Sequence, residues 1–98
     1  MNKADKARFD ALTDQGCIVC RLVLSVWTPP DIHHLRSGVG MGQRSGHERT
    51  IPLCHTHHQG QWGIHAMGTR AWEAHFGYSE ERLLTITNAL LRGEQCEA

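Results

Sequence analysis

Two pairs of metal-ligating residues stand out in the 98-residue chain, each with two residues between its members, namely Cys17-x-x-Cys20 and Cys54-x-x-His57. A gap of two residues lets both side chains of a pair turn onto one ion, and two pairs complete the tetrahedral sulfur and nitrogen set of structural zinc. Spacing selects His57 as the fourth ligand, although further histidines adjoin it on both sides. We therefore expect a structural Zn²⁺ ion that supplements the small core of a short chain.

A Cys-x-x-Cys pair is also found in redox proteins, where it accompanies a thioredoxin-like βαβ pattern. No such pattern surrounds Cys17 and Cys20, so we prefer the metal interpretation. A redox protein remains a weaker hypothesis. It would be supported if the thiols of Cys17 and Cys20 were found to bind no metal. Cys96 has no partner pair, and we interpret it as an exposed spare thiol.

Four further histidines can form a second site: the adjacent His33 and His34, then His58 and His65. Adjacent residues of an extended segment point to opposite sides, so one histidine of the first pair can bind a metal while the other faces water. His65 follows His58 by seven residues, which is two turns of one face if a helix continues. The pattern favours a divalent ion held by His33, His58 and His65, with His34 as a general base.

That arrangement suits hydrolysis of a phosphodiester. A metal ion neutralises charge on the phosphoryl oxygens, and a neutral imidazole accepts a proton from the attacking water. Residues 36–49 form a loop with four glycines and three arginines, and we expect Arg36, Arg44 and Arg49 to contact DNA phosphates. The alternative is that these histidines are ordinary core or surface residues that bind no metal.

The elements that must position these residues follow from periodicity and turn signals. Helices are expected over residues 3–15 and 79–92, the second with Ser79 as its N-cap and a stripe of leucines. Residues 21–27 are rich in β-branched side chains and predict a strand. The remaining expected elements are short extended pieces at 31–35 and 50–53, a helix from 54 to 65 interrupted near Gly60 and Gly63, and a helix at 69–76.

Composition sets broader limits on the class of protein. The formal net charge is zero, so charge alone does not indicate a nucleic-acid partner. The first residues contain no apolar segment of a leader peptide, and no stretch is apolar for the length of a membrane span. We expect a cytoplasmic α+β protein that forms a single domain over residues 1–98, without a membrane partner.

The complete succession of motifs is more specific than any one of them. It comprises Cys-x-x-Cys, Asp-x-His-His-Leu, the glycine-rich loop, Ile-Pro-Leu-Cys-x-x-His-His, Ile-His and the Gly-x-x-x-Trp-Glu of residues 68–73. This succession resembles the HNH (ββα-metal) endonucleases over residues 17–77. It is most similar to the phage and prophage subgroup that includes the recombination-enhancement (Ref-like) RecA-dependent nucleases.

The resemblance implies a zinc-stabilised ββα-metal domain with its core at 17–77 and flanking N- and C-terminal helices. It implies cleavage of DNA with a divalent ion (Mg²⁺, Mn²⁺ or Zn²⁺), a role in recombination or DNA processing, and a recombinase filament as a partner. By position, His34 resembles the general base, His33 the first metal ligand, and His58 and His65 the ligands from the helix.

Two departures from the family pattern bear on the function. The Asn of the HNH motif has no equivalent, since Arg49 stands at its place with His47 and Glu48 adjacent. The gap between His58 and His65 is longer than the family pattern, so it needs two regular turns or a local loop. The alternative function is therefore a non-catalytic zinc-binding module, a decayed nuclease that binds nucleic acid or a protein.

Overall fold

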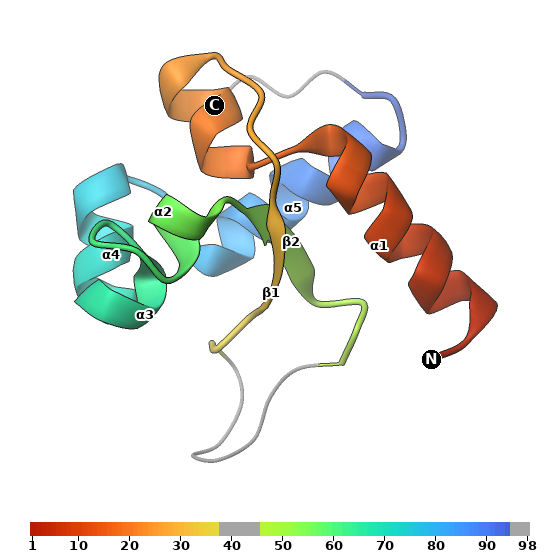
Figure 1. The fold of residues 1–98 in the computed structure, drawn as a ribbon, viewed down its shortest axis with the longest axis horizontal. Coiled ribbons are helices and arrows are strands. Elements are labelled where there is room, and N and C mark those ends of the chain that lie inside the picture. Colours follow the sequence, from red (N-terminus) through yellow and green to blue (C-terminus); the bar gives the residue numbers. More distant parts are fainter. Residues whose placement is uncertain (38–45, 95–98) are drawn as a thin grey trace.

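The computed structural model of the chain describes residues 1–37 and 46–94, which form an α+β fold (Figure 1). No helix in these residues has the length and apolar character that a membrane crossing requires. The elements follow in the order α1 (Lys3–Gln15), a π-helix (Cys20–Leu24), β1 (Asp31–His34), β2 (Thr50–Leu53), α2 (His55–His58), α3 (Ile64–Met67), α4 (Thr69–Phe76) and α5 (Glu80–Leu91).

The two strands form an antiparallel sheet in which Ile32 lies opposite Pro52 and His33 lies opposite Ile51. Proline donates no backbone hydrogen bond, and a two-stranded sheet tolerates it because each strand has an open edge. Along β1, His33 is buried and His34 is half-buried. The alternation of a strand therefore places the two adjacent histidines on opposite faces, as the sequence predicted.

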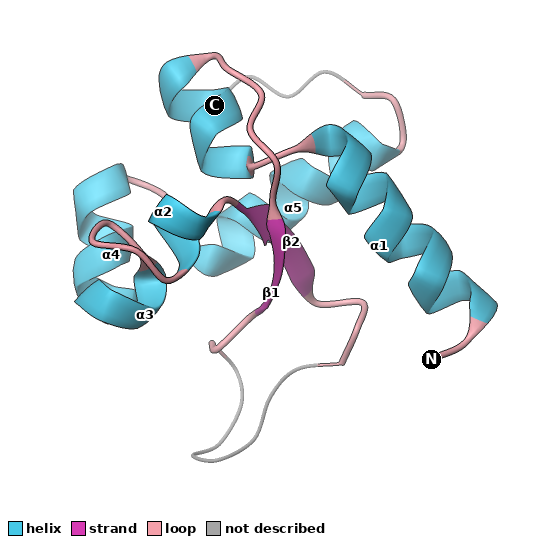
Figure 2. Ribbon diagram, viewed as in Figure 1, coloured by secondary structure: helices cyan, strands magenta, loops and turns pink. Residues whose placement is uncertain are grey.

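Helices surround this small sheet, as Figure 2 shows, with α1 on one side, α2 to α4 on the other, and α5 behind. Both α1 and α2 contact the two strands, while α5 contacts β2 and α1. The core is filled by fully buried side chains from different elements, among them Leu12 of α1, Ile51 of β2, Trp72 of α4 and Leu83 of α5. The strands that carry or adjoin the histidines are therefore packed from several directions.

Arg8 of α1 ties three elements together. Its guanidinium donates to the side-chain oxygen of Thr50 at 2.9 Å, to the carbonyl oxygen of Thr50 at 2.7 Å, and to Asn88 Oδ1 of α5 at 2.9 Å. Thr50 begins β2 and lies opposite His34 in the sheet. The three hydrogen bonds therefore hold the end of the sheet that presents His34.

The strand predicted at residues 21–27 is wrong, because Cys20–Leu24 forms a π-helix. Val23 and Leu24 are exposed, and Ser25 ends the helix with a left-handed backbone, φ 56°. The wound turn lets the Cys20 amide donate to Cys17 Sγ at 3.4 Å. A β-branched residue favours a strand only when its side chain packs against neighbours in a sheet, and Val23 is exposed. The helical conformation, which brings Cys20 close to Cys17, is therefore adopted instead.

The ends of the long helices agree with the sequence. Helix α1 stops where Gly16 adopts φ 82°, and the Ser79 side chain caps α5 by accepting the Arg82 amide. The interruption expected near Gly60 and Gly63 separates α2 from α3. The helix predicted over 79–92 is α5, which ends at Leu91.

Candidate metal centres

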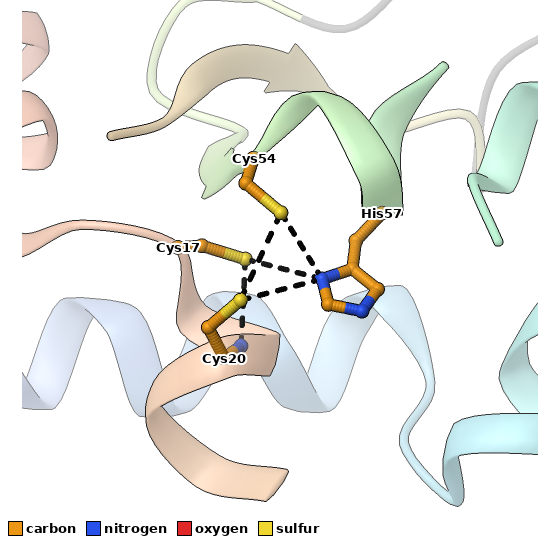
Figure 3. A group of neighbouring side chains, drawn as sticks. All are labelled: Cys17, Cys20, Cys54 and His57. Atoms are coloured by element: carbon orange, nitrogen blue, oxygen red, sulfur yellow. Dashed lines mark hydrogen bonds between the residues drawn. The ribbon is translucent and has the colours of Figure 1, made fainter. Parts of the chain in front are cut away.

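Three thiols and one imidazole meet beside α2, and they are the four residues that the sequence paired (Figure 3). Cys17 and Cys20 come from the chain after α1, Cys54 follows β2, and His57 lies in α2. The sulfurs of Cys20 and Cys54 are 3.8 Å apart. His57 Nδ1 lies 3.7, 3.5 and 3.2 Å from the sulfurs of Cys17, Cys20 and Cys54. All four side chains are buried.

These separations match the edges of a tetrahedron around one ion. With metal–sulfur bonds of about 2.3 Å, two bound sulfurs lie about 3.8 Å apart, and a bound sulfur and nitrogen about 3.6 Å apart. The observed Cys20–Cys54 and Cys20–His57 separations are 3.8 and 3.5 Å. Sulfur ligands with an imidazole favour zinc over magnesium or calcium. The cluster can therefore hold a metal ion, and its donors are consistent with zinc.

Burial favours the uncharged forms of Cys17, Cys20 and His57 in the metal-free chain. It raises the pKa of the Cys17 thiol to about 12, and it also raises the pKa of Cys20. The pKa of His57 is lowered, again by burial. An ion that binds thiolates must therefore displace protons from this cluster.

A second cluster forms from His33 of β1, His58 of α2 and His65 of α3, whose ligand nitrogens all lie within 4.8 Å of one another. Nε2 of His58 is 3.0 Å from Nε2 of His65. Two nitrogens bound to one ion at about 2.1 Å would be about 3.0 Å apart in octahedral geometry and about 3.4 Å apart in tetrahedral geometry. The cluster therefore has donors and spacing that suit a divalent ion.

The route that brings His65 to His58 is a local loop, which is one of the two alternatives that the sequence left open. The chain leaves α2, turns through Gly60 to Gly63 and re-enters a helix at α3. A Cβ on Gly63 would lie 2.6 Å from the carbonyl carbon of His58, so only glycine allows this close approach. A tight turn, and not two regular helical turns, sets the distance between the two rings.

Polar neighbours orient the two helical histidines of this cluster. Nδ1 of His58 lies 3.3 Å from Asp31 Oδ2, and Nδ1 of His65 lies 3.0 Å from Arg36 Nη1. Burial is the main cause that lowers the pKa of both His58 and His65. Both rings therefore favour the neutral form. Arg36 can only donate, so Nδ1 of His65 accepts and Nε2 of that ring carries its proton until an ion that binds Nε2 displaces the Arg36 contact.

Glu80, the first residue of α5, is a buried neighbour of His33 that the sequence analysis missed. Its Oε2 lies 2.6 Å from His33 Nε2, and neither side chain is more than 1% exposed. Its carboxylate also accepts the backbone N–H groups of Arg36 at 3.1 Å and Ser37 at 2.9 Å. Although burial alone would raise the pKa of Glu80, these hydrogen bonds outweigh it and the pKa is lowered. The carboxylate is therefore ionised at neutral pH.

His34, the predicted general base, lies on the opposite face of β1 and outside the three-histidine cluster. Its Nε2 is 3.0 Å from Nδ1 of His47, and the edge of Phe9 packs near both rings. Of the three residues considered for the missing Asn, His47 places its ring within hydrogen-bond distance of His34. Arg49 instead pairs with Glu81.

The three predicted DNA-binding arginines differ in their surroundings. Arg36 is exposed at the end of β1, with its guanidinium at His65. Arg49 donates to Glu81 and to the Ser37 carbonyl at 3.2 Å, and the hydrogen bond to Glu81 raises the pKa of Arg49. Arg44 lies outside the described residues, as does the predicted spare thiol of Cys96.

The described residues thus form a small α+β protein with two clusters of cysteine and histidine that can hold metal ions. The family described as "Recombination enhancement, RecA-dependent nuclease" matches residues 2–81, which is most of the 98-residue chain. The chain belongs to this family. It is accordingly a nuclease that acts on DNA, and the dependence on RecA agrees with the predicted recombinase partner. No curated protein and no solved structure matches the chain.

Proposed function

We propose that this protein is a metal-dependent endonuclease of the HNH (ββα-metal) class, of phage or prophage origin, that hydrolyses DNA phosphodiester bonds during recombination or DNA processing. The observation that carries the proposal is the convergence of ring nitrogens from His33, His58 and His65 within 4.8 Å. The order of elements around them, two antiparallel strands followed by a helix, is the order that the HNH resemblance implies.

In this proposal His33, His58 and His65 hold the catalytic ion, which is Mg²⁺, Mn²⁺ or Zn²⁺. When bound, the ion supplies positive charge that stabilises the phosphoryl group and the leaving oxygen. His34 accepts the proton of the attacking water as general base. His47, 3.0 Å from His34, orients the base in place of the missing Asn.

The Cys₃His cluster serves a structural role in the same proposal. Cys17, Cys20, Cys54 and His57 hold one Zn²⁺ ion, and binding energies of about 10–16 kcal/mol for such sites exceed the stability of a typical small domain. We take residues 17–77 as the core of a single domain over 1–98, with the helices at 3–15 and 79–92 flanking it. The ion then joins the segment that precedes β1 to the segment that follows β2.

DNA binding in this proposal relies on local charge, because the net charge is zero. Arg36 is exposed and lies beside His65, so a phosphate that it binds would be next to the ion. Arg49 and Arg44 extend the basic segment, and each released counterion adds to affinity. A recombinase filament would bring the enzyme to paired DNA.

The test is cleavage of a plasmid, with Mg²⁺ or Mn²⁺, in the presence and absence of a RecA filament on homologous single-stranded DNA. Wild-type protein should nick or cut the plasmid, and His34→Ala should abolish cutting while zinc content and circular dichroism are retained. His75→Ala is the matched control, because His75 is exposed and belongs to neither cluster. DNA binding without cleavage under every ion would reject the proposal and leave a non-catalytic zinc-binding module.

A further inference from the structure

Glu80 enters the histidine cluster from outside every motif described above. It begins α5, a separate helix at the far end of the chain from β1, yet it is 0% exposed and lies 2.6 Å from His33. Its oxygens are not among the atoms that cluster with the three ring nitrogens. Glu80 therefore contacts a proposed ligand without being placed to bind the ion itself.

The contact fixes which nitrogen of His33 can bind a metal. Both oxygens of Glu80 already accept backbone N–H groups from Arg36 and Ser37, so the carboxylate acts as an acceptor and the 2.6 Å contact requires that His33 Nε2 carries the proton. In a neutral imidazole the lone pair then belongs to Nδ1. Carboxylates commonly hold metal-binding histidines in this way, and they set the tautomer and the orientation of the ring.

The same carboxylate also holds the chain that follows β1. Glu80 Oε1 accepts the Ser37 amide at 2.9 Å, and the Arg36 amide lies 3.1 Å from both carboxylate oxygens. The Arg36 guanidinium in turn lies 3.0 Å from His65. One side chain thus restrains both a proposed ligand and the arginine that adjoins another.

Glu80 is itself held in place by α4. Its backbone amide donates to Glu73 Oε2 at 2.6 Å, and Ser79 caps the helix immediately before it. Glu73 belongs to the Gly-x-x-x-Trp-Glu segment, whose Trp72 is fully buried. Contacts from α4 and from the cap of α5 therefore restrict how far Glu80 can move.

We propose that Glu80 is a positioning residue of the three-histidine metal site: it presents Nδ1 of His33 to the ion and fixes the Arg36 segment beside that ion. The inference rests on the proposed function and extends the site to α5. Glu80 acts through His33 and the backbone, and it neither binds the ion nor touches the substrate.

The first test measures the wild-type protein directly. Long-range ¹H–¹⁵N NMR of the histidine rings, on protein that carries one equivalent of zinc, should show His33 as the Nε2–H tautomer. Addition of a further equivalent of diamagnetic Zn²⁺ should shift Nδ1 of His33 as this nitrogen binds the ion, while Nε2 keeps its proton. A ring that is protonated on Nδ1, or one that binds the ion through Nε2, would overturn the proposal without any mutant.

The second test uses Glu80→Gln, which keeps the size of the side chain and removes its charge. We expect Mn²⁺ affinity, measured by electron paramagnetic resonance, to fall about ten- to hundredfold while one equivalent of zinc is retained. Glu80→Asp keeps the charge and should recover part of the affinity. Unchanged Mn²⁺ binding by Glu80→Gln would contradict the proposal.

Thr85→Ala is the matched control on the same helix, because Thr85 is exposed and its hydroxyl donates to the Glu81 carbonyl oxygen at 3.1 Å, away from the carboxylate of Glu80. It should leave Mn²⁺ affinity unchanged, and an equal loss of affinity would assign the effect to the helix instead of Glu80. The proposed function fails separately. If wild-type protein binds Mn²⁺ but never cuts DNA, the nuclease assignment falls while the role of Glu80 in the site stands.

Discussion

His34 Nε2 lies 3.0 Å from His47 Nδ1, and the two rings come from opposite ends of the segment that joins β1 to β2. Both are half-buried, with the edge of Phe9 against them. The His47 carbonyl also accepts a hydrogen bond from Thr50 Oγ1 at 2.8 Å, so the backbone of His47 is anchored to the start of β2. The proposed base is thus held by a residue in the turn that precedes β2, which restricts rotation of its ring.

Replacement of His47 should therefore reduce catalysis more than binding. We expect His47→Ala to lower kcat about 10- to 100-fold with KM for DNA nearly unchanged, because the orientation of the base is lost and not a contact to the phosphate. His47→Asn should recover part of the rate, since its amide can also hydrogen-bond to His34. Single-turnover cleavage under saturating protein measures both, and equal rates for His47→Ala and wild type would remove His47 from the site.

Loss of one sulfur ligand should remove the structural ion and most of the fold. Cys17→Ser is expected to bind far less than one equivalent of zinc and to lose its cooperative melting transition, because a domain of this size depends on such an ion. Metal analysis and thermal unfolding test this. The thiol control is Cys96→Ser, which should keep zinc and melting temperature. A normal melting curve for Cys17→Ser would refute the structural role.

Zinc binding should release protons and weaken as the solution becomes more acidic. Burial raises the pKa of Cys17 to about 12 and also raises that of Cys20, so both thiols are protonated at pH 7 in the metal-free chain. The ion binds the thiolate forms, so each of these thiols must lose its proton when zinc binds. The apparent affinity must then rise with pH and fall on acidification. Calorimetry in buffers of different ionisation enthalpy counts the protons, and an enthalpy independent of the buffer would show that the thiols were already ionised.

Arg36 should contribute to DNA affinity without specifying sequence. Its substitution by Gln is expected to weaken DNA binding about equally for all sequences and to reduce the salt slope of log K by about 1. Arg21→Gln is the control, because Arg21 is exposed on the π-helix and its side chain makes no hydrogen bond among the described residues. Fluorescence anisotropy over a range of salt concentrations measures the slope of log K for each variant. The same slope for Arg36→Gln and Arg21→Gln would contradict the prediction.

Ligand spacing and helix caps were readable from the sequence, because both depend on neighbours a few residues apart. Cys17-x-x-Cys20 and Cys54-x-x-His57 need only short turns to aim each pair at one point, and Ser79 needs only the amide three residues ahead. The expected helix at 3–15 and the strand at 50–53 appear for the same reason. Local chemistry was sufficient for these elements.

Long-range contacts were not readable in this way. Glu80 lies 47 residues from His33, and its only sequence signal is a spacing of three and four residues before the buried Leu83 and Leu84. That spacing places an acidic side chain on the apolar face of α5. Its partner could not be named, because the pairing depends on how α5 docks against the sheet.

The π-helix shows the opposite error, in which a real local preference is overruled. Residues 21–27 have the composition of a strand, but no neighbouring strand pairs with them in the described structure. A β-branched run without a partner gains nothing from extension. The requirement that Cys17 and Cys20 face the same point decides the backbone there.

His57 and His58 are consecutive in the chain, yet one ring joins the sulfur cluster and the other joins the trio of imidazoles. The short helix α2 orients both rings, so zinc binding by His57 also places His58 in the proposed catalytic site. Under the proposed function, a newly synthesised chain therefore cannot cut the chromosome until it has bound zinc. Zinc starvation or a chelator would then inactivate the enzyme by emptying the Cys₃His cluster, which is not the site where the phosphodiester is cleaved.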